Sequence, residues 1–229
     1  MSRATFHDSA DAAVAGIEDG STVLVGGFGM AGMPVTLIEA LTRQGATDLT
    51  VVSNNAGNGD TGLAALLAAG RVRKIICSFP RQADSWVFDR LYRDGRIELE
   101  VAPQGNLAER MRAAGAGIGA FFCPTGVDTP LAEGKETRVI EGREHVLEYP
   151  IKGDVALFGA HRADRLGNLV FRKTARNFGP VMATAATTTI VEVGGVVETG
   201  ALDPEAIVTP SIYVDRVLDL SALQEGAGQ

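Results

Sequence analysis

A glycine-rich turn is the first segment of the sequence whose residue types could do chemistry. It follows the apolar segment Thr22–Val25 and consists of Gly26-Gly27-Phe28-Gly29-Met30-Ala31-Gly32, so four of its seven residues are glycine. Glycine accepts positive φ angles and lets the backbone approach a ligand without a Cβ atom in the way. Pro34 suits the first position of a helix, where a backbone N–H is not needed. Because N–H groups at a helix start bind anions, the turn is a candidate site for a phosphate or an oxyanion.

Neutral amide side chains follow two further apolar segments. Asn54 and Asn55 come after Leu49–Val52, and Gln104 comes after residues 97–101. A side-chain amide can donate a hydrogen bond to an oxygen that becomes negative in a transition state, and one such donor contributes on the order of 10²–10³ in rate. Asparagine is also a common turn residue, and Gln104 could simply follow Pro103 in a loop. Both interpretations stay open for these residues.

The elements that would position these residues alternate between strand and helix. Apolar spacing predicts strands at residues 22–25, 49–52, 74–79 and 97–101, and helices at residues 8–17, 35–44, 63–69, 84–93 and 107–114. This alternation is typical of an α/β fold built from βαβ units with a mostly parallel sheet. Ligands of such sheets bind beyond the carboxyl ends of the strands, and the glycine turn and all three amides follow strands.

The pattern changes after Gly115. Residues 121–123 and the pair 137–140 and 144–149 predict short strands and a hairpin, and further apolar segments follow at 155–160, 169–171 and 189–193, with a helical stretch at 180–186. We expect an additional mixed or antiparallel β portion in the second half. It would pack against the parallel half to form a single domain over residues 1–229.

Composition excludes several classes of function. The chain has 229 residues and a net charge of −7, with 21 Lys and Arg against 28 Asp and Glu, so nothing favours nucleic-acid binding. Cys77, Cys123 and the three histidines, His7, His145 and His161, have no metal-site or catalytic spacing, so we expect no metal. No apolar run reaches the ~18–20 residues of a membrane span, and the first residues lack the apolar core of a signal peptide. These features predict a cytoplasmic protein.

One alternative is a dinucleotide site, because Gly27, Gly29 and Gly32 have the G-x-G-x-x-G spacing of NAD-binding proteins. That site requires an acidic residue at the end of the second strand, where this chain has Ser53 followed by two asparagines. Asp60 lies too far along the next turn. An NAD-dependent oxidoreductase is therefore disfavoured, and a tight turn without any ligand is a second alternative.

Five segments in order resemble one family. Residues 19–34 contain Asp19-Gly20, then the sequence Val-Leu-Val-Gly-Gly-Phe, and then Gly32 and Pro34. This segment resembles the signature of the first (A-type, or alpha) subunit of the family I 3-oxoacid CoA-transferases. Residues 49–60, 103–117, 125–129 and 163–177 are similar to further segments of that family, and the resemblance extends over about residues 20–217. Residues 77–81 and 148–151 look most like the 3-oxoadipate-type enzymes of aromatic catabolism, the β-ketoadipate pathway. Acetoacetate-type enzymes share the same motifs.

The resemblance implies a reaction and a partner. CoA would be transferred from succinyl-CoA to a 3-oxo acid, with the CoA thioester as a substrate and no permanently bound cofactor. The nucleophile of this family is a glutamate in a Ser-Glu-Asn-Gly motif of the second (B-type) subunit, and that tetrapeptide does not occur in this chain. We therefore expect half of a hetero-oligomeric enzyme. A CoA-binding module without catalytic activity is a further alternative.

The resemblance also implies roles for the residues described above. Residues 26–32 would contact CoA, and Gln104 would bind the carboxylate or keto group of the substrate. From its chemistry, Asn54 is the residue that we expect to donate to the oxyanion. A dicarboxylate substrate would need a cation for its far end, and four residues are candidates because arginine and lysine bind carboxylates: Arg81, Arg172, Lys173 and Arg176.

Three residues depart from the family pattern. Asp128 replaces a usual glycine, Asn106 a usual threonine, and Gly119 a common proline. A carboxylate beside an acyl-CoA or a dicarboxylate would repel it. Asp128 therefore lies away from the ligand, or it changes the substrate preference, or it reduces activity.

Overall fold

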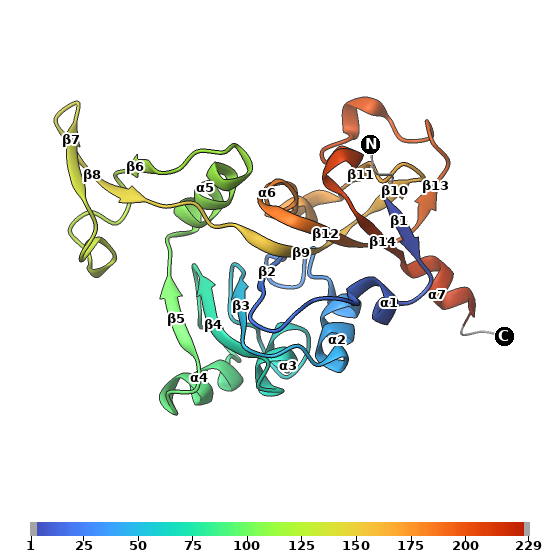
Figure 1. Cartoon of the computed structure of the whole chain (residues 1–229), viewed down its shortest axis with the longest axis horizontal. Coiled ribbons are helices and arrows are strands. Elements are labelled where there is room, and N and C mark those ends of the chain that lie inside the picture. The colour runs from blue at the N-terminus through green and yellow to red at the C-terminus, as the bar shows by residue number, and fades with distance from the viewer. Residues whose placement is uncertain (1–3, 227–229) are drawn as a thin grey trace.

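The computed structural model describes residues 4–226 and contains an eight-stranded sheet whose neighbouring strands are all parallel (Figure 1). Across the sheet the strands are β1 (Thr5–His7), β14 (Arg216–Asp219), β12 (Ala186–Val193), β9 (Gly153–Ala160), β2 (Thr22–Val25), β3 (Leu49–Val52), β4 (Val72–Cys77) and β5 (Glu98–Val101). This arrangement confirms the α/β class and the mostly parallel sheet.

Helices cover both faces of the sheet (Figure 1). Side chains alternate along each strand, so Val23 and Val25 of β2 belong to the core on one face and Leu24 to the core on the other. The first core is completed by α1 (Ala10–Val14), α2 (Val35–Gln44), α3 (Leu63–Ala68) and α4 (Trp86–Arg93), and the second by α5 (Gln104–Gly115) and α6 (Gly179–Ala185). The result is a three-layer α/β/α arrangement in which strand ends meet at one edge.

The additional β portion predicted for the second half is present as two small sheets. One is antiparallel and consists of β6 (Phe121–Cys123), β8 (Arg143–Glu148) and β7 (Thr137–Ile140), and its hairpin projects at the left of Figure 1. The other is mixed and consists of β11 (Leu169–Val170), β10 (Arg162–Asp164) and β13 (Val196–Val197). The remaining short elements are η1 (Pro130–Ala132), η2 (Lys173–Arg176), η3 (Pro204–Ala206), η4 (Ser211–Tyr213) and α7 (Leu220–Gly226).

The structure corrects several predictions from the sequence. Strands β9, β12 and β14 belong to the second half of the chain but join the main sheet, with β9 directly beside β2. A continuous apolar run indicates a strand that is buried on both faces, but it does not show which strands lie beside it. Pro34 lies at the N-cap of α2 instead of its first turn. Helix α5 begins at Gln104 and not at Leu107, so this glutamine is part of a helix.

Candidate functional site

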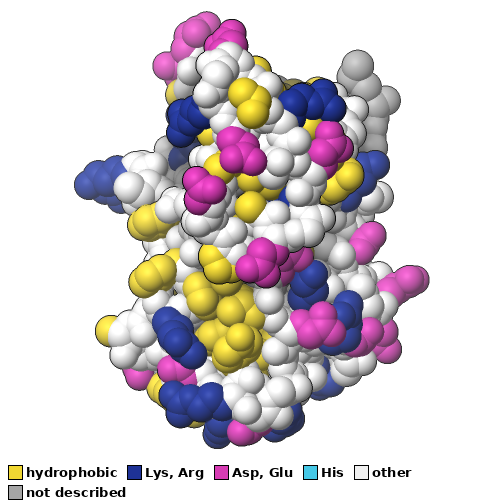
Figure 2. Space-filling view, turned by 90° about the vertical axis from the view of Figure 1, so that its left-hand side faces the viewer, with side chains coloured by type: hydrophobic (Ala, Val, Ile, Leu, Met, Phe, Trp, Pro, Cys, Tyr) yellow, Lys and Arg dark blue, Asp and Glu magenta, His cyan; other side chains and the backbone are white. Residues whose placement is uncertain are grey.

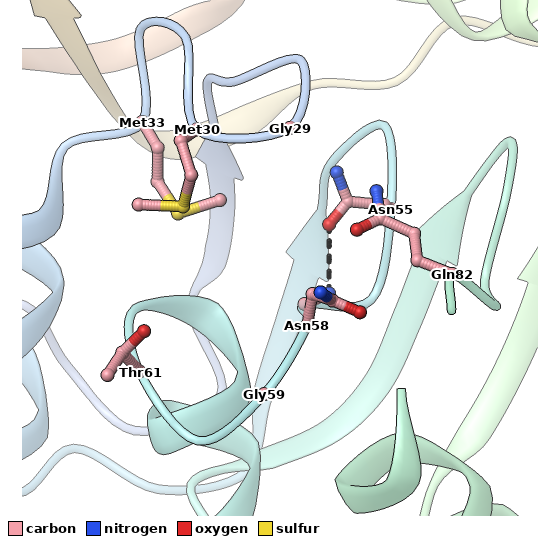
Figure 3. A pocket seen from close by; sticks show the side chains of 9 residues that line it. Gly29, Met30, Met33, Asn55, Asn58, Gly59, Thr61 and Gln82 are labelled. Carbon is pink, nitrogen blue, oxygen red and sulfur yellow. Dashed lines mark hydrogen bonds between the residues drawn. The ribbon is translucent and has the colours of Figure 1, made fainter. Parts of the chain in front are cut away.

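The carboxyl ends of β2, β3 and β4 and the start of α5 meet at one edge of the sheet, because these strands are parallel neighbours. Two cavities lie there. The Asn54 cavity, of about 380 Å³, is lined by Phe28, Gly29, Asn54, Ser78, Phe79, Gln82 and Gln104. The Asn55 cavity, of about 260 Å³, is lined by Gly29, Met30, Met33, Asn55, Gly57, Asn58, Gly59, Thr61 and Gln82 (Figure 3). Since Gly29 and Gln82 line both, the two cavities are adjacent.

The glycine turn forms a two-residue hairpin over these cavities. Phe28 N donates to Ala31 O at 3.0 Å, Ala31 N donates to Phe28 O at 3.3 Å, and Gly29 lies at the tip with a φ of +59°. The backbone N–H groups of Gly29 and Met30 donate to no acceptor among residues 4–226. These two amides are therefore available to a ligand.

The other members of the turn have different surroundings. The N–H of Gly26 donates to Leu157 O at 2.8 Å, and a Cβ atom on Gly26 would lie 2.5 Å from the Cβ of Phe158. The N–H of Gly27 also has an acceptor within the chain, at 3.2 Å. Gly26 and Gly27 therefore shape the turn and do not offer free amides. Of the seven residues predicted to contact CoA, only Phe28, Gly29 and Met30 line the two cavities.

The start of helix α2 is already occupied, which corrects the prediction that its N–H groups are free for a ligand. Glu192 of β12 is 7% exposed and accepts a hydrogen bond from Leu37 N at 3.1 Å, close to the N–H groups of Thr36 and Val35. Burial raises the pKa of the Glu192 carboxyl to about 7, although the three N–H groups oppose this shift. Only the amides of the turn itself remain for an anion.

Asn54 is held in place by the exit of β4. Its side chain is 6% exposed, and its Oδ1 accepts a hydrogen bond from Ser78 Oγ at 2.6 Å. Its carbonyl oxygen accepts from the N–H groups of Ser78 and Phe79. As placed, Nδ2 has no acceptor among residues 4–226, and Asn54 lines the cavity named after it. The arrangement presents a fixed neutral donor at the cavity.

Asn55 presents a second donor. Its Oδ1 accepts from Gly57 N at 2.9 Å, which is the dashed line in Figure 3, while its Nδ2 is buried without a partner among residues 4–226. Figure 3 shows the Asn55 side chain beside Gln82, with Met30 and Met33 extending from the glycine turn. An unpaired buried N–H₂ costs free energy unless a ligand or water accepts from it.

Gln104 lies in the first turn of α5 and lines the Asn54 cavity together with Phe28. The structure therefore brings Asn54, Gln104 and the tip of the glycine turn together, as expected for residues that follow strands of a parallel sheet. Sequence reasoning missed Ser78 and Gln82. Ser78 follows β4 directly, so the rule about strand ends could have found it, whereas Gln82 had no such signal.

The four cationic candidates for a far carboxylate do not line the Asn54 cavity. Arg81 forms an ion pair with Asp89 at 2.6 Å. Arg172 lines a separate cavity of about 290 Å³ together with Glu192 and Gly32. Lys173 and Arg176 lie in η2. That one of the four binds the far carboxylate of a dicarboxylate substrate stays a prediction.

Two of the three departures from the family pattern have a structural explanation. Asn106 is 2% exposed, donates to Glu148 Oε1 at 3.1 Å and accepts from Cys123 Sγ at 3.3 Å, so it ties α5 to β8 and β6. Asp128 has a φ of +59°, a left-handed conformation that glycine adopts more easily, which explains the usual glycine at this position. Its side chain lines a different cavity, together with Arg143. Gly119 is exposed and has no neighbour within 4 Å of a Cβ position. Neither Asp128 nor Asn106 touches the two cavities of the site.

Residues 4–226 contain no group of three or more His, Cys, Asp or Glu side chains placed to bind a metal ion. Within the same range, no helix is both long and apolar enough to cross a membrane.

Comparison with known proteins connects this geometry to a family. A family model described as Coenzyme A transferase matches residues 7–220. The A-type subunit of the 3-oxoadipate CoA-transferase of Pseudomonas putida is 66% identical over 94% of this chain and 93% of its own. The A-type subunit of the probable succinyl-CoA:3-ketoacid coenzyme A transferase of Bacillus subtilis (strain 168) is 51% identical over 91% of this chain and 87% of its own.

Solved structures agree on the fold. A variant of the decarboxylase AibA/AibB superposes with a TM-score of 0.81 at 26% identity, over 96% of this chain and 84% of that one. One fold can host different reactions, so this likeness shows the fold and not the reaction. Membership also removes the dinucleotide alternative, whose acidic residue is missing after the second strand of that unit. The chain belongs to the coenzyme A transferase family, as an A-type subunit of a CoA-transferase.

Proposed function

We propose that this chain is the first subunit of an enzyme that transfers CoA from succinyl-CoA to a 3-oxo acid, with 3-oxoadipate as the favoured acceptor. The observation that carries the proposal is the meeting of Asn54, Gln104 and Gly29, whose backbone amide is free, around one cavity. The acceptor is inferred from the 66% identical relative, which is named for 3-oxoadipate. An acetoacetate-type acceptor is the alternative, because relatives at 51% and 52% identity are named for 3-ketoacids.

The proposed reaction is a ping-pong exchange. A glutamate carboxylate of the second subunit attacks the thioester carbonyl carbon of succinyl-CoA, and the CoA thiolate leaves to give a mixed anhydride. The thiolate then attacks the glutamyl carbonyl, releases succinate and forms an enzyme-CoA thioester. The 3-oxo acid repeats these two steps in reverse and leaves as its CoA thioester, so the glutamate is regenerated.

This chain would supply neutral hydrogen-bond donors to that reaction. Asn54 Nδ2 would donate to the oxyanion of each tetrahedral intermediate, where one donor contributes on the order of 10²–10³ in rate. Its position is fixed before the reaction by Ser78, which reduces the reorganisation needed in the transition state. The N–H groups of Gly29 and Met30 would bind the CoA portion, and Gln104 would bind the carboxylate or keto group of the acceptor.

The proposal requires a second subunit in a hetero-oligomer, which we place in the cytoplasm and in aromatic catabolism. Two observations support a second subunit: the relatives are named as A-type subunits, and this chain has an apolar surface. Figure 2 shows hydrophobic side chains gathered in the lower half of one side, the side that carries β5 and the β7–β8 hairpin in Figure 1. Val101 of β5 and Trp86 of α4, two elements at the lower left of Figure 1, are exposed. Such side chains are typical of a surface that another protein chain covers.

The test is co-expression of the chain with the product of the neighbouring open reading frame. The purified complex should form 3-oxoadipyl-CoA from succinyl-CoA and 3-oxoadipate faster than it forms acetoacetyl-CoA from acetoacetate. Faster turnover of acetoacetate would replace the acceptor with the alternative. A stable complex that carries an intact Ser-Glu-Asn-Gly motif but transfers CoA to no 3-oxo acid would refute the enzymatic proposal and favour a CoA-binding module.

A further inference from the structure

One side-chain amide, that of Asn177, spans the base of the glycine turn. Its Oδ1 accepts a hydrogen bond from Gly27 N at 3.2 Å, and its Nδ2 donates to Ala31 O at 2.9 Å. Gly27 and Ala31 flank the hairpin tip, whose N–H groups at Gly29 and Met30 are free of acceptors among residues 4–226. Asn177 therefore joins the two sides of the turn from a segment 150 residues away in the chain.

The same amide is fixed on its other side by its own segment. Phe178 N donates to Oδ1 at 2.8 Å, and Nδ2 donates to Thr174 O at 2.8 Å. The oxygen thus accepts from two N–H groups and the nitrogen donates both of its protons to carbonyls. This pattern admits one orientation of the amide, because a flipped amide would place oxygen against two carbonyl oxygens.

The segment that carries Asn177 also packs directly on the turn. A Cβ atom on Gly32 would lie 2.5 Å from Ala175 O and 2.9 Å from Asn177 Nδ2. Asn177 itself lines a small cavity together with Phe28 and Gln104. The residue therefore lies next to the site and contacts its backbone, but both polar atoms of its side chain are engaged within the chain.

We infer that Asn177 is a positioning residue that sets the location of the free Gly29 and Met30 amides for binding the CoA thioester. This inference rests on the proposed function of the turn. One of the two bonds holds Gly27 and the other holds Ala31. Because both sides of the hairpin are held, the tip cannot pivot as a unit. Without the amide the tip keeps its internal Phe28–Ala31 pairing but loses its fixed distance from Asn54.

The test replaces Asn177 with Asp in the complex with the second subunit. The substitution keeps the shape of the side chain and the oxygen that accepts from Gly27. It replaces the NH₂ group, which donates to the carbonyls of Ala31 and Thr174, with an oxygen that cannot donate. We expect the KM for succinyl-CoA to rise at least about tenfold and kcat/KM to fall about 10²-fold, since a misplacement of about 1 Å has this effect. Without substrate, hydrogen–deuterium exchange at residues 28–33 should become faster.

Asn168→Asp is the matched control. Asn168 is also a part-buried amide, whose Nδ2 donates to Asp164 Oδ2 at 2.8 Å and whose Oδ1 accepts from Ser211 N at 2.9 Å. The control should lose stability without changing the KM or the exchange of residues 28–33. If Asn177→Asp gives no stable complex, Asn177→Ala is measured in the same way; it adds no charge and removes all four side-chain hydrogen bonds, including the one from Gly27.

Unchanged KM and unchanged exchange in the Asn177 variant would overturn the inference, as would equal changes in the Asn168 control. Faster exchange of the turn with an unchanged KM would also overturn it, because the turn would then move without affecting the thioester. A wild-type complex that transfers no CoA contradicts the proposed function instead, and is recognised before any variant is compared.

Discussion

Replacing Glu192 with Gln tests whether a buried carboxyl group occupies the start of helix α2 at a cost in stability. Glu192 accepts from the N–H of Leu37 and is almost fully buried at the end of β12. Glutamine keeps an oxygen that can accept the same hydrogen bonds but cannot ionise. The variant therefore separates the role of the acceptor from the cost of the charge.

The size of the effect follows from the pKa. Burial raises the pKa of Glu192 from its ordinary 4.5 to about 7. The folded chain then binds the proton more tightly than the unfolded chain, so stability falls as the pH rises from about 4.5 to about 7 and is level above that. At about 1.4 kcal/mol for each pH unit in this window, the loss is about 3 kcal/mol. For a chain of this length it corresponds to roughly 6–12 °C in the unfolding midpoint.

The assay is thermal unfolding of wild type and Glu192→Gln between about pH 5 and pH 8. The unfolding midpoint of the variant minus that of the wild type should increase across this range by roughly 6–12 °C. Glu205→Gln removes the same formal charge from an exposed position in η3 and is the control for the loss of one negative charge. A difference for Glu192→Gln that is constant with pH would refute the reasoning. If the midpoint of the variant minus that of the wild type decreased as the pH rises, the helix dipole would outweigh burial and keep the carboxylate ionised.

Three other substitutions test the site and its surroundings. Asn54→Asp should lower kcat by about 10²–10³, measured with succinyl-CoA and 3-oxoadipate, because it replaces a fixed donor with an acceptor. A decrease below tenfold would remove Asn54 from the proposed mechanism. Gly32→Ala should lower the unfolding midpoint well beyond Gly29→Ala, because its Cβ would lie 2.5 Å from Ala175 O whereas that of Gly29 meets nothing within 4 Å. Asp128→Gly should leave both KM values unchanged and raise stability by up to about 1 kcal/mol, since it removes a side chain from a left-handed conformation; a change in either KM would place Asp128 near substrate after all.

Local sequence was sufficient for the part of the fold that carries the site. Strand β2, helix α2 and strand β3 have the predicted bounds, because an apolar strand, a glycine turn and an amphipathic helix follow one another without interruption. The rule that parallel strands present their carboxyl ends at one edge then predicted the meeting of Gly29, Asn54 and Gln104. The rule succeeded because β2 to β5 are consecutive in the chain and also adjacent in the sheet.

Interactions between distant segments had no such signal. Glu192 reaches the start of α2 from 155 residues away, and Asn177 reaches Gly27 from 150. Each depends on where β9 and β12 enter the sheet, and apolar runs of that kind do not specify their neighbours. The segment with Asn177 was singled out only by family resemblance, whereas Glu192 belonged to an apolar run and was not singled out at all.

The composition of the two cavities limits what this chain can contribute to the chemistry. Their side chains are amides, hydroxyls, thioethers and aromatic rings, and none of the residues that line them is charged. Neutral donors of fixed orientation favour a charge that develops during the reaction, because they need no reorganisation at that moment. They bind a pre-existing carboxylate less strongly than an arginine does, because a charge-assisted hydrogen bond is about twice as strong as a neutral one. The far carboxylate of a dicarboxylate acceptor would then need a cation from outside these linings, and Arg81, already paired with Asp89, is poorly suited to provide it.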